Sequence, residues 1–219
     1  MPLAACLPAP PLETLGLMEP SRGTGAFSSA EWVFALPTPG YRMLAEFGLG
    51  TGAVRRGRGA RLRSRRGVDA ARWFPEIARA LGVLYLPRTV VDGEVCVLDA
   101  AGRSDPRLLH ARALHPGHPP GTSPVVMCVR DVLVWDGRDV RSLPWRERRQ
   151  LLQSLPLQDQ ASLKLARAVR AEGHWLYRQA CALGHEAIHA HRADAPYVAG
   201  RSIAWLSIPV AAAMQELAA

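Results

Sequence analysis

The stretch WVFALPTPGYR, from Trp32 to Arg42, limits the fold of this chain more than any other. Apolar and aromatic residues fill Glu31–Leu36, and the side chains of Tyr41–Phe47 alternate between two faces. Both segments predict strands. The Pro-Thr-Pro-Gly between them must be a turn, because two prolines cannot donate to a central ladder. We therefore expect two strands of a sheet on either side of this turn.

The rest of the chain mixes helix and strand patterns. Asp69–Leu81 carries apolar residues at helical spacing behind Asp69 as N-cap, and a short helix is expected near Pro106–Leu114. Trp145–Leu155 and Gly173–Leu183 have helical patterns too. Strands are predicted for Ala60–Arg65, Val83–Leu86, Val91–Leu98, Val125–Trp135, Ser162–Val169, Glu186–Arg192 and Ser202–Ile208. This mixture, with several hairpins, predicts an α+β domain built on mostly antiparallel sheets.

The two ends of the chain have no periodic pattern. Residues 1–30 are rich in proline and predict an extended lead-in on the surface. One domain is expected over residues 31–209, followed by a short tail at 210–219. No apolar run reaches the roughly 18 residues of a membrane span, and no export signal is visible. We expect no membrane partner and a cytoplasmic location, with association with the nucleoid as a further option.

The charge of the chain favours a polyanionic partner. Its net charge is +8, and Lys164 is its single lysine, a bias typical of GC-rich bacterial genes. The segment Arg55–Arg66 reads RRGRGARLRSRR and alternates from Ala60. It predicts a strand with one phosphate-tracking face, against the alternative of an ordinary solvated strand. The predicted DNA contacts are Arg55, Arg56, Arg58, Arg61, Arg63 and Arg66.

The cysteines and histidines predict no metal centre on their own. The 4 cysteines form no Cys-x-x-Cys pair and are expected to be reduced, small apolar residues. His110, His115 and His118 bracket a proline-rich segment without a cysteine or carboxylate pattern beside them. A solvated loop is the expected structure there.

The order of the motifs resembles the adenylation domain of ATP-dependent DNA ligases, in the form found in bacterial end-joining ligases. Gly40, Tyr41 and Arg42 match the end of the signature Lys-x-Asp-Gly-Tyr-Arg. The nucleophilic lysine of that signature falls on Pro37 and its aspartate on Pro39. The resemblance runs from about residue 32 to residue 209. It implies a nucleotidyltransferase domain of the DNA ligase and mRNA capping enzyme type, with two antiparallel sheets packed with flanking helices and a cleft between them.

The resemblance also implies a remnant nucleotide site. Ser64-Arg65-Arg66-Gly67 resembles the family's Ser-Arg-Asn-Gly, and Asp92-Gly93-Glu94 its Asp-Gly-Glu, whose glutamate would hold the ribose hydroxyls. The strand that ends in DVLVWDG normally begins with an aromatic residue that stacks on adenine, and that position is Arg130. A guanidinium can also stack on a base. The implied nucleotide-binding residues are Arg42, Arg65, Glu94 and Arg130.

The C-terminal motifs have lost their lysines. GHEAIHAHR, ending at Arg192, resembles Gly-Leu-Glu-Gly-Val-Val-Ala-Lys-Arg, with Glu186 kept where the family positions a metal. Residues 205–209 resemble Trp-Leu-Lys-Val-Lys. The degenerate catalytic positions are Pro37, Pro39, His191, Ser207 and Pro209. Ligases continue into an oligonucleotide-binding barrel, for which we expect no room in the 210–219 tail.

These losses predict a catalytically degenerate pseudo-ligase that binds DNA in repair or recombination. Adenylation needs a lysine amine that attacks the α-phosphate, and further cations that neutralise the triphosphate. We expect no required cofactor, with residual binding of ATP and Mg²⁺ left open, and DNA and a DNA repair protein as partners. One alternative is an active ligase or nucleotidyltransferase that uses a partner chain or an unorthodox nucleophile, His189 or His191. The other is a protein interaction module.

Overall fold

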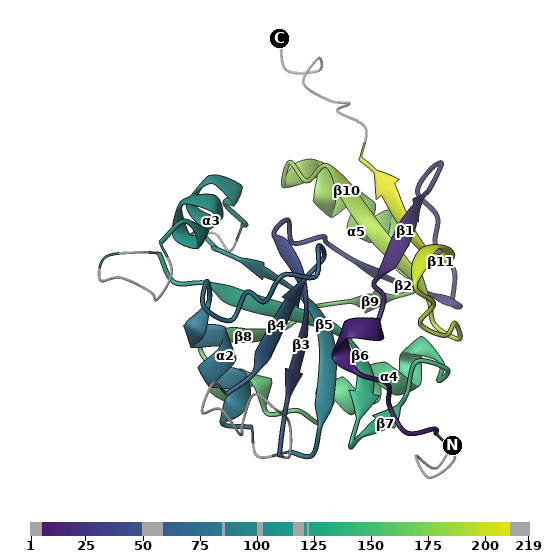
Figure 1. Cartoon of the computed structure of the whole chain (residues 1–219). Coiled ribbons are helices and arrows are strands. Elements are labelled where there is room, and N and C mark those ends of the chain that lie inside the picture. The colour runs from purple at the N-terminus through teal and green to yellow at the C-terminus, as the bar shows by residue number, and fades with distance from the viewer. Residues whose placement is uncertain are drawn as a thin grey trace. The chain divides into compact units, whose positions relative to one another are not determined.

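The computed structural model describes residues 6–49, 59–84, 86–99, 103–115, 121 and 123–210. The chain divides into two compact units. Unit 1 comprises residues 1–17, 38–143 and 147–166, and unit 2 comprises residues 18–37, 144–146 and 167–219. Each unit contains one sheet and few helices (Figure 1). The prediction of an α+β fold with mostly antiparallel sheets is therefore confirmed.

Unit 1 is built on a six-stranded sheet. Across it run β4 (Arg61–Ser64), β3 (Tyr41–Phe47), β5 (Thr89–Cys96), β6 (Val126–Trp135) and β7 (Arg138–Asp139), and β8 (Leu163–Leu165) pairs in parallel with β6. Its helices are α2 (Pro75–Gly82), α3 (Pro106–Ala113), most of α4 (Trp145–Gln153), and the 3-10 helices η2 (Leu12–Thr14) and η3 (Leu157–Asp159).

The two faces of this sheet differ in chemistry because successive side chains of a strand point to opposite sides. Met43, Phe47, Leu62, Val91 and Val129 join the main hydrophobic core on one face. The opposite side, which we call the polar face, carries Arg42 and Glu46 of β3, Asp92, Glu94 and Cys96 of β5, and Cys128 and Asp131 of β6. The alternation predicted for β3 is thus confirmed.

Two glycines of the motifs stand where the chain passes close to a neighbouring strand. A Cβ at Gly40 would collide with the carbonyl oxygen of Val95, and one at Gly93 would lie 2.8 Å from the carbonyl oxygen of Cys128. The predicted turn after β6 forms as expected. Asp136 and Gly137 have φ angles of 48° and 68°, which is the conformation that a two-residue hairpin requires.

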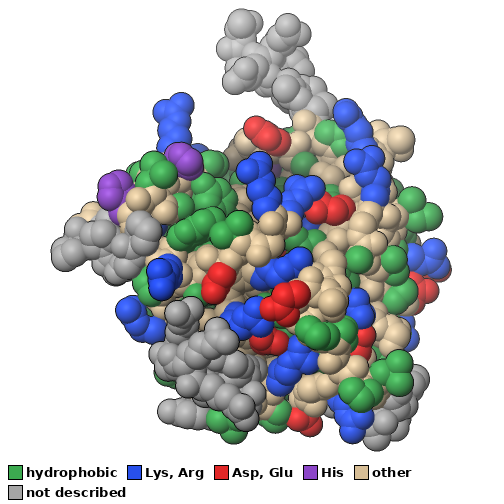
Figure 2. Space-filling view, in the orientation of Figure 1, with side chains coloured by type: hydrophobic (Ala, Val, Ile, Leu, Met, Phe, Trp, Pro, Cys, Tyr) green, Lys and Arg blue, Asp and Glu red, His purple; other side chains and the backbone are tan. Residues whose placement is uncertain are grey.

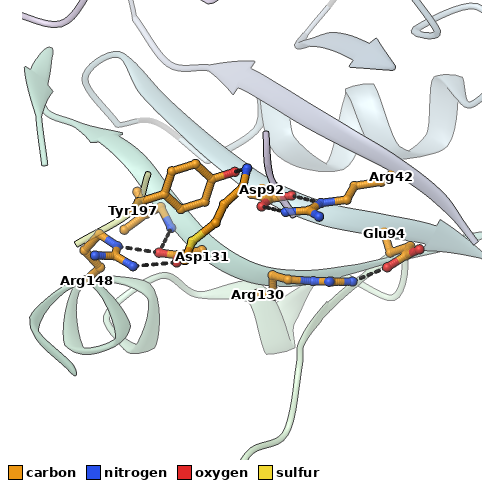
Figure 3. A network of polar contacts seen from close by, with 9 residues as sticks. Arg42, Asp92, Glu94, Arg130, Asp131, Arg148 and Tyr197 are labelled. Atoms are coloured by element: carbon orange, nitrogen blue, oxygen red, sulfur yellow. Dashed lines mark hydrogen bonds and ion pairs between the residues drawn. The ribbon is translucent and has the colours of Figure 1, made fainter. Parts of the chain in front are cut away.

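Unit 2 is built on a five-stranded sheet. Its order is β1 (Met18–Arg22), β11 (Gly200–Pro209), β10 (Ala187–Arg192), β2 (Trp32–Ala35) and β9 (Val169–Arg170), with β1 parallel to β11. Helix α5 (Gly173–Ala182) packs on this sheet (Figure 1). Leu176 and Ala180 of the helix share a buried cluster with Phe34, Ile188 and Ile208. The Tyr197 hydroxyl accepts a hydrogen bond of 2.9 Å from the backbone N–H of Met18 (Figure 3).

The N-terminal segment is not the surface lead-in that its prolines predict. Leu12 and Leu15 are among the most deeply buried side chains, and Met18 is buried as well. The prediction was wrong because the apolar side chains at positions 12, 15 and 18 are buried, and this burial holds the segment against the rest of the chain despite the prolines around them. The predicted tail at 211–219 lies outside the described residues.

Four other predictions of local structure need correction. Helix α2 begins at Pro75 rather than Asp69, because a residue before proline avoids the helical region and proline favours the first helical position. Residues 83 and 84 form a turn and not a strand. The predicted strand 91–98 lies two residues earlier, as β5. The segment 162–169 contributes to β8 of unit 1 and to β9 of unit 2.

Within the described ranges, no helix has both the length and the hydropathy that a bilayer span requires.

Candidate functional site

Arg42, the last residue of the opening motif, is bound by a buried carboxylate on the next strand. Its Nε and one terminal nitrogen donate to the two carboxylate oxygens of Asp92 at 3.0 and 2.6 Å (Figure 3). The Asp92 side chain is 1% exposed and that of Arg42 is 10% exposed. A fork-to-fork pair of this kind is strong and fixes geometry. Arg42 and Asp92 therefore tie β3 to β5.

Glu94 and Arg130 form a second ion pair on the polar face (Figure 3). The register of β5 and β6 shifts between Asp92 and Gly93, where Asp131 lies opposite Asp92 and Val129 opposite Gly93. Arg130 is therefore the extra residue of a β-bulge, a feature that re-aims a side chain. The structure thus brings together two predicted nucleotide-binding residues, but as partners of each other.

Asp131 and Arg148 form a third pair, which is the most deeply buried (Figure 3). Arg148 of α4 donates to both carboxylate oxygens of Asp131 at 2.8 Å. Their side chains are 1% and 5% exposed. Asp131 also accepts a hydrogen bond from the backbone N–H of Val132. This pair holds α4 against β6.

The predicted DNA-binding arginines of β4 contact the N-terminal segment. Arg61 forms ion pairs with Glu13 and with the buried Glu46, and Arg63 donates to the carbonyl oxygen of Leu15 at 2.8 Å. The Glu13 carboxylate has a lowered pKa because Arg61 donates a hydrogen bond to it. These two side chains therefore anchor the segment that carries η2. The predicted contacts Arg55, Arg56 and Arg58 lie outside the described residues.

Arg65 and Arg66 lie in a turn and do not continue β4 as the alternation predicts. The N–H of Gly67 donates to the carbonyl of Ser64 at 2.8 Å, and Gly67 has a φ of 83°. Both arginine side chains are exposed. The backbone N–H of Arg65 also donates to the carbonyl oxygen of Arg42 at 3.2 Å, which places this turn beside β3.

His191, the position of a family lysine, is held in an aromatic stack in unit 2. Its ring lies 4.9 Å from that of Trp205 and 5.8 Å from that of Trp145, with interplanar angles of 20° and 23°. His189 meets Trp205 edge-on at 5.4 Å. Sequence reasoning did not foresee this stack. The adjacent positions of His191 and Trp205 on paired strands were its only signal, and Trp145 comes from a distant segment.

The side chains at the other degenerate positions carry no positive charge. Pro37 follows β2, and the carbonyl of Pro39 accepts a hydrogen bond from the Ser104 hydroxyl. Ser207 and Pro209 lie on β11, opposite His189 and Ala187. Glu186 is exposed just before β10. Across the described ranges, no group of three His, Cys, Asp or Glu residues is arranged to hold a metal ion.

Comparisons with known proteins agree on one family. The model of the ATP dependent DNA ligase domain matches residues 53–208. The chain belongs to the ATP-dependent DNA ligase family. The multifunctional non-homologous end joining protein LigD of Pseudomonas aeruginosa is 30% identical over 202 residues, which are 91% of this chain and 22% of that protein. A probable DNA ligase of Kineococcus radiotolerans is 32% identical over 151 residues, or 68% of this chain and 29% of that protein.

The solved ligase structures give the same result. A mycobacterial DNA ligase D complexed with ATP and MES superposes with a TM-score of 0.72 at 27% identity, covering 91% of this chain and 61% of that one. A Chlorella virus DNA ligase-adenylate, at 15% identity, has a TM-score of 0.62 and covers 89% of this chain and 67% of that one. The ligase-type nucleotidyltransferase fold predicted from the motifs is thus confirmed. The chain spans 22% to 29% of the length of the two curated relatives named above.

Two features, one in each unit, bear on whether a nucleotide could bind in the manner that the family motifs imply. Arg130 binds the carboxylate that would hold the ribose, and it also replaces the aromatic residue expected at the base. His191 is stacked between two tryptophans, and the remaining phosphate-side positions are Pro37, Ser207 and Pro209. The predicted cleft that joins Glu94 to Glu186 involves both units and stays a prediction.

Proposed function

We propose that this chain is a catalytically silent member of the ATP-dependent DNA ligase family that binds DNA in repair or recombination. Pro37 carries the proposal, because it stands at the position of the nucleophilic lysine. A proline within a chain has no amine that could attack a phosphate. The single lysine of the sequence, Lys164, lies exposed on β8, a strand outside the family's recognised motifs. Labelling of the protein by ATP tests this proposal directly.

The loss of phosphate-side cations supports the same conclusion. Transfer of a nucleotide requires positive groups where charge develops on the leaving pyrophosphate. His191, Ser207 and Pro209 replace lysines at these positions. Neither Ser207 nor Pro209 can carry a positive charge.

A role on DNA is supported by the distribution of charge. Unit 1 carries most of the positive excess of the chain. On the face shown in Figure 2, however, basic side chains lie among acidic ones. Many arginines of unit 1 are bound by carboxylates, among them Arg42, Arg61, Arg130 and Arg148. Arg65 and Arg66, in the turn after β4, are exposed, so phosphates in solution can approach their side chains.

We expect the protein to bind duplex DNA with little sequence preference, because phosphate contacts carry no base information. If about three to five phosphates are neutralised, the logarithm of affinity should fall against the logarithm of salt with a slope of roughly −3 to −4.5. Arg65→Ala with Arg66→Ala should flatten this slope by about two units and weaken all sequences alike. Fluorescence anisotropy at several salt concentrations measures both effects.

The matched control removes the same charge from unit 2. Arg170 and Arg178 are both exposed, and Arg170→Ala with Arg178→Ala should leave the slope unchanged. Arg61→Ala with Arg63→Ala should act mainly on stability, because these side chains hold the N-terminal segment. An equal loss of DNA affinity in the Arg65/Arg66 and Arg170/Arg178 double variants would show that only the net charge of the protein affects binding. No binding by the parent protein at low salt would leave the interaction module as the better hypothesis.

A further inference from the structure

Two cysteines lie together on the polar face of unit 1, outside the main hydrophobic core. Cys96 of β5 and Cys128 of β6 have their sulfur atoms 3.9 Å apart. They occupy diagonal positions, since Cys128 lies opposite Glu94 and Cys96 opposite Val126. A disulfide has its sulfurs about 2.05 Å apart. The two sulfurs are therefore in contact, and a bond between them would shorten their separation by about 1.9 Å and draw the two diagonal positions closer together.

The surroundings of the pair divide the two thiols into different chemical roles. The pKa of Cys128 is lowered to about 7, first by a hydrogen bond from Cys96, then by the Thr38 hydroxyl and the charge of Arg130. Burial and Glu94 act in the opposite direction. The pKa of Cys96 is raised by its hydrogen bond with Cys128 and by burial.

These contacts favour a pair in which Cys128 reacts with an oxidant and Cys96 then forms a disulfide with it. The thiolate is the nucleophile in cysteine chemistry, and a neighbouring positive charge stabilises it. Cysteines that respond to oxidants pair a low-pKa thiol with a second thiol within reach. A soft metal site is less favoured, since no third ligand accompanies the pair among the described residues. Cys128 is 8% exposed and Cys96 is fully buried, so Cys128 is the more accessible of the two.

We propose that Cys96 and Cys128 form a redox-modifiable dithiol site that a small peroxide converts to an intramolecular disulfide. The Cys128 thiolate attacks one peroxide oxygen, the O–O bond breaks, and Cys128 becomes a sulfenic acid while hydroxide leaves and takes up a proton. The Cys96 thiol then attacks this sulfur, losing its proton, and the hydroxyl leaves as water. Two thiols and one hydrogen peroxide thus give one disulfide and two waters.

Intact mass and peptide mapping test the site in a Cys6→Ser, Cys181→Ser background, which removes the other two cysteines. Hydrogen peroxide at neutral pH should lower the mass by about 2 Da, as two hydrogens leave, and should link the peptides of Cys96 and Cys128. Dithiothreitol should reverse the change. In the added Cys96→Ser variant the mass should rise instead, because the sulfenic acid finds no thiol. Unlinked peptides in the background protein, with oxygen added to either cysteine, would overturn the proposal.

The pH dependence of alkylation distinguishes a reacting thiol from a packed one. With iodoacetamide, Cys128 should react along a profile centred near pH 7, below the 8.5 or so of an ordinary thiol. Arg130→Gln should shift that profile upward and slow the reaction severalfold at pH 7, and Arg130→Lys should restore most of it. Circular dichroism confirms that each variant is folded. A profile centred near pH 8.5 in the parent would contradict the assignment of Cys128 as the reacting thiol. So would a profile that is the same in the parent and in Arg130→Gln.

Discussion

Incubated with ATP labelled at its α-phosphate and a divalent metal ion, the protein should carry no label after denaturing electrophoresis. A covalent nucleotidyl intermediate requires a nucleophile at the family position, and Pro37 has none. An active ligase domain of the family, assayed in parallel, should be labelled and is the positive control. The label should be present on the control and absent from this protein, which makes this the sharpest test of the proposed function.

Two variants decide what a positive result would mean. His191→Ala removes the histidine at the former lysine position, and Lys164→Arg removes the single lysine while keeping the charge. A label that survives denaturation in the parent and disappears in one of these variants would show an unorthodox nucleophile. The protein would then be an enzyme, and the proposed silent role would be wrong. The dithiol proposal would be unaffected, because it involves neither His191 nor a lysine nucleophile.

Restoring the lysine by itself should not restore nick sealing. In Pro37→Lys, the neighbouring Pro39 and the phosphate-side Ser207 and Pro209 remain unchanged. Glu94 also remains bound by Arg130. We therefore expect no ligated product from nicked duplex DNA on a denaturing gel. Efficient sealing by this single variant would show that the other positions matter less than the family motifs imply.

Arg148→Gln should lower the free energy of unfolding by about 3–5 kcal/mol, the usual cost of removing one partner of a buried ion pair. The substitution leaves the Asp131 carboxylate, 5% exposed, without the two charged hydrogen bonds that Arg148 donates. Urea denaturation followed by circular dichroism measures the change. Much of it reflects the buried charge that is left behind and not the net value of the pair.

The same substitution at an exposed pair provides the control. Arg103 forms an ion pair with Asp99, with side chains 66% and 34% exposed, and Arg103→Gln should cost only about 0–1 kcal/mol. Arg148→Met combined with Asp131→Asn removes both charges and should recover part of the loss. Equal costs at Arg148 and Arg103 would mean that burial does not set the energetics of the Asp131 pair.

Strands and helices with strong local patterns could be predicted from the sequence. The alternation of Tyr41–Phe47 and the turn at Asp136-Gly137 both depend on neighbours in the chain, and the structure confirms them. The N-terminal segment could not be predicted, because Leu12 and Leu15 gain their burial from distant partners. The strand β9 was not predicted as a separate strand, for a related reason. The single strand predicted over residues 162–169 does not reveal that the chain passes from one unit to the other.

The motifs located the candidate site but not the contacts within it. Arg42, Glu94 and Arg130 could be identified by their order, yet their pairing depends on strand register and on the bulge at Arg130, which a sequence does not display. From the sequence alone, the cysteines are expected to be reduced, small apolar residues. Their contact could not be foreseen, because residues 96 and 128 meet only when β5 and β6 pair.

The strand order of unit 2 has a consequence for synthesis on the ribosome. Its sheet places β1 beside β11 and β2 beside β10, so residues 18–22 pair with residues 200–207, and residues 32–35 with residues 189–192. Unit 1 is drawn largely from the middle of the chain and can assemble earlier. The apolar side chains of Met18 and Phe34 must wait until residues 187–209 have emerged. Pairings so distant in sequence form slowly and leave strand edges open to aggregation. The nascent protein should therefore depend on chaperones until its last strand is made.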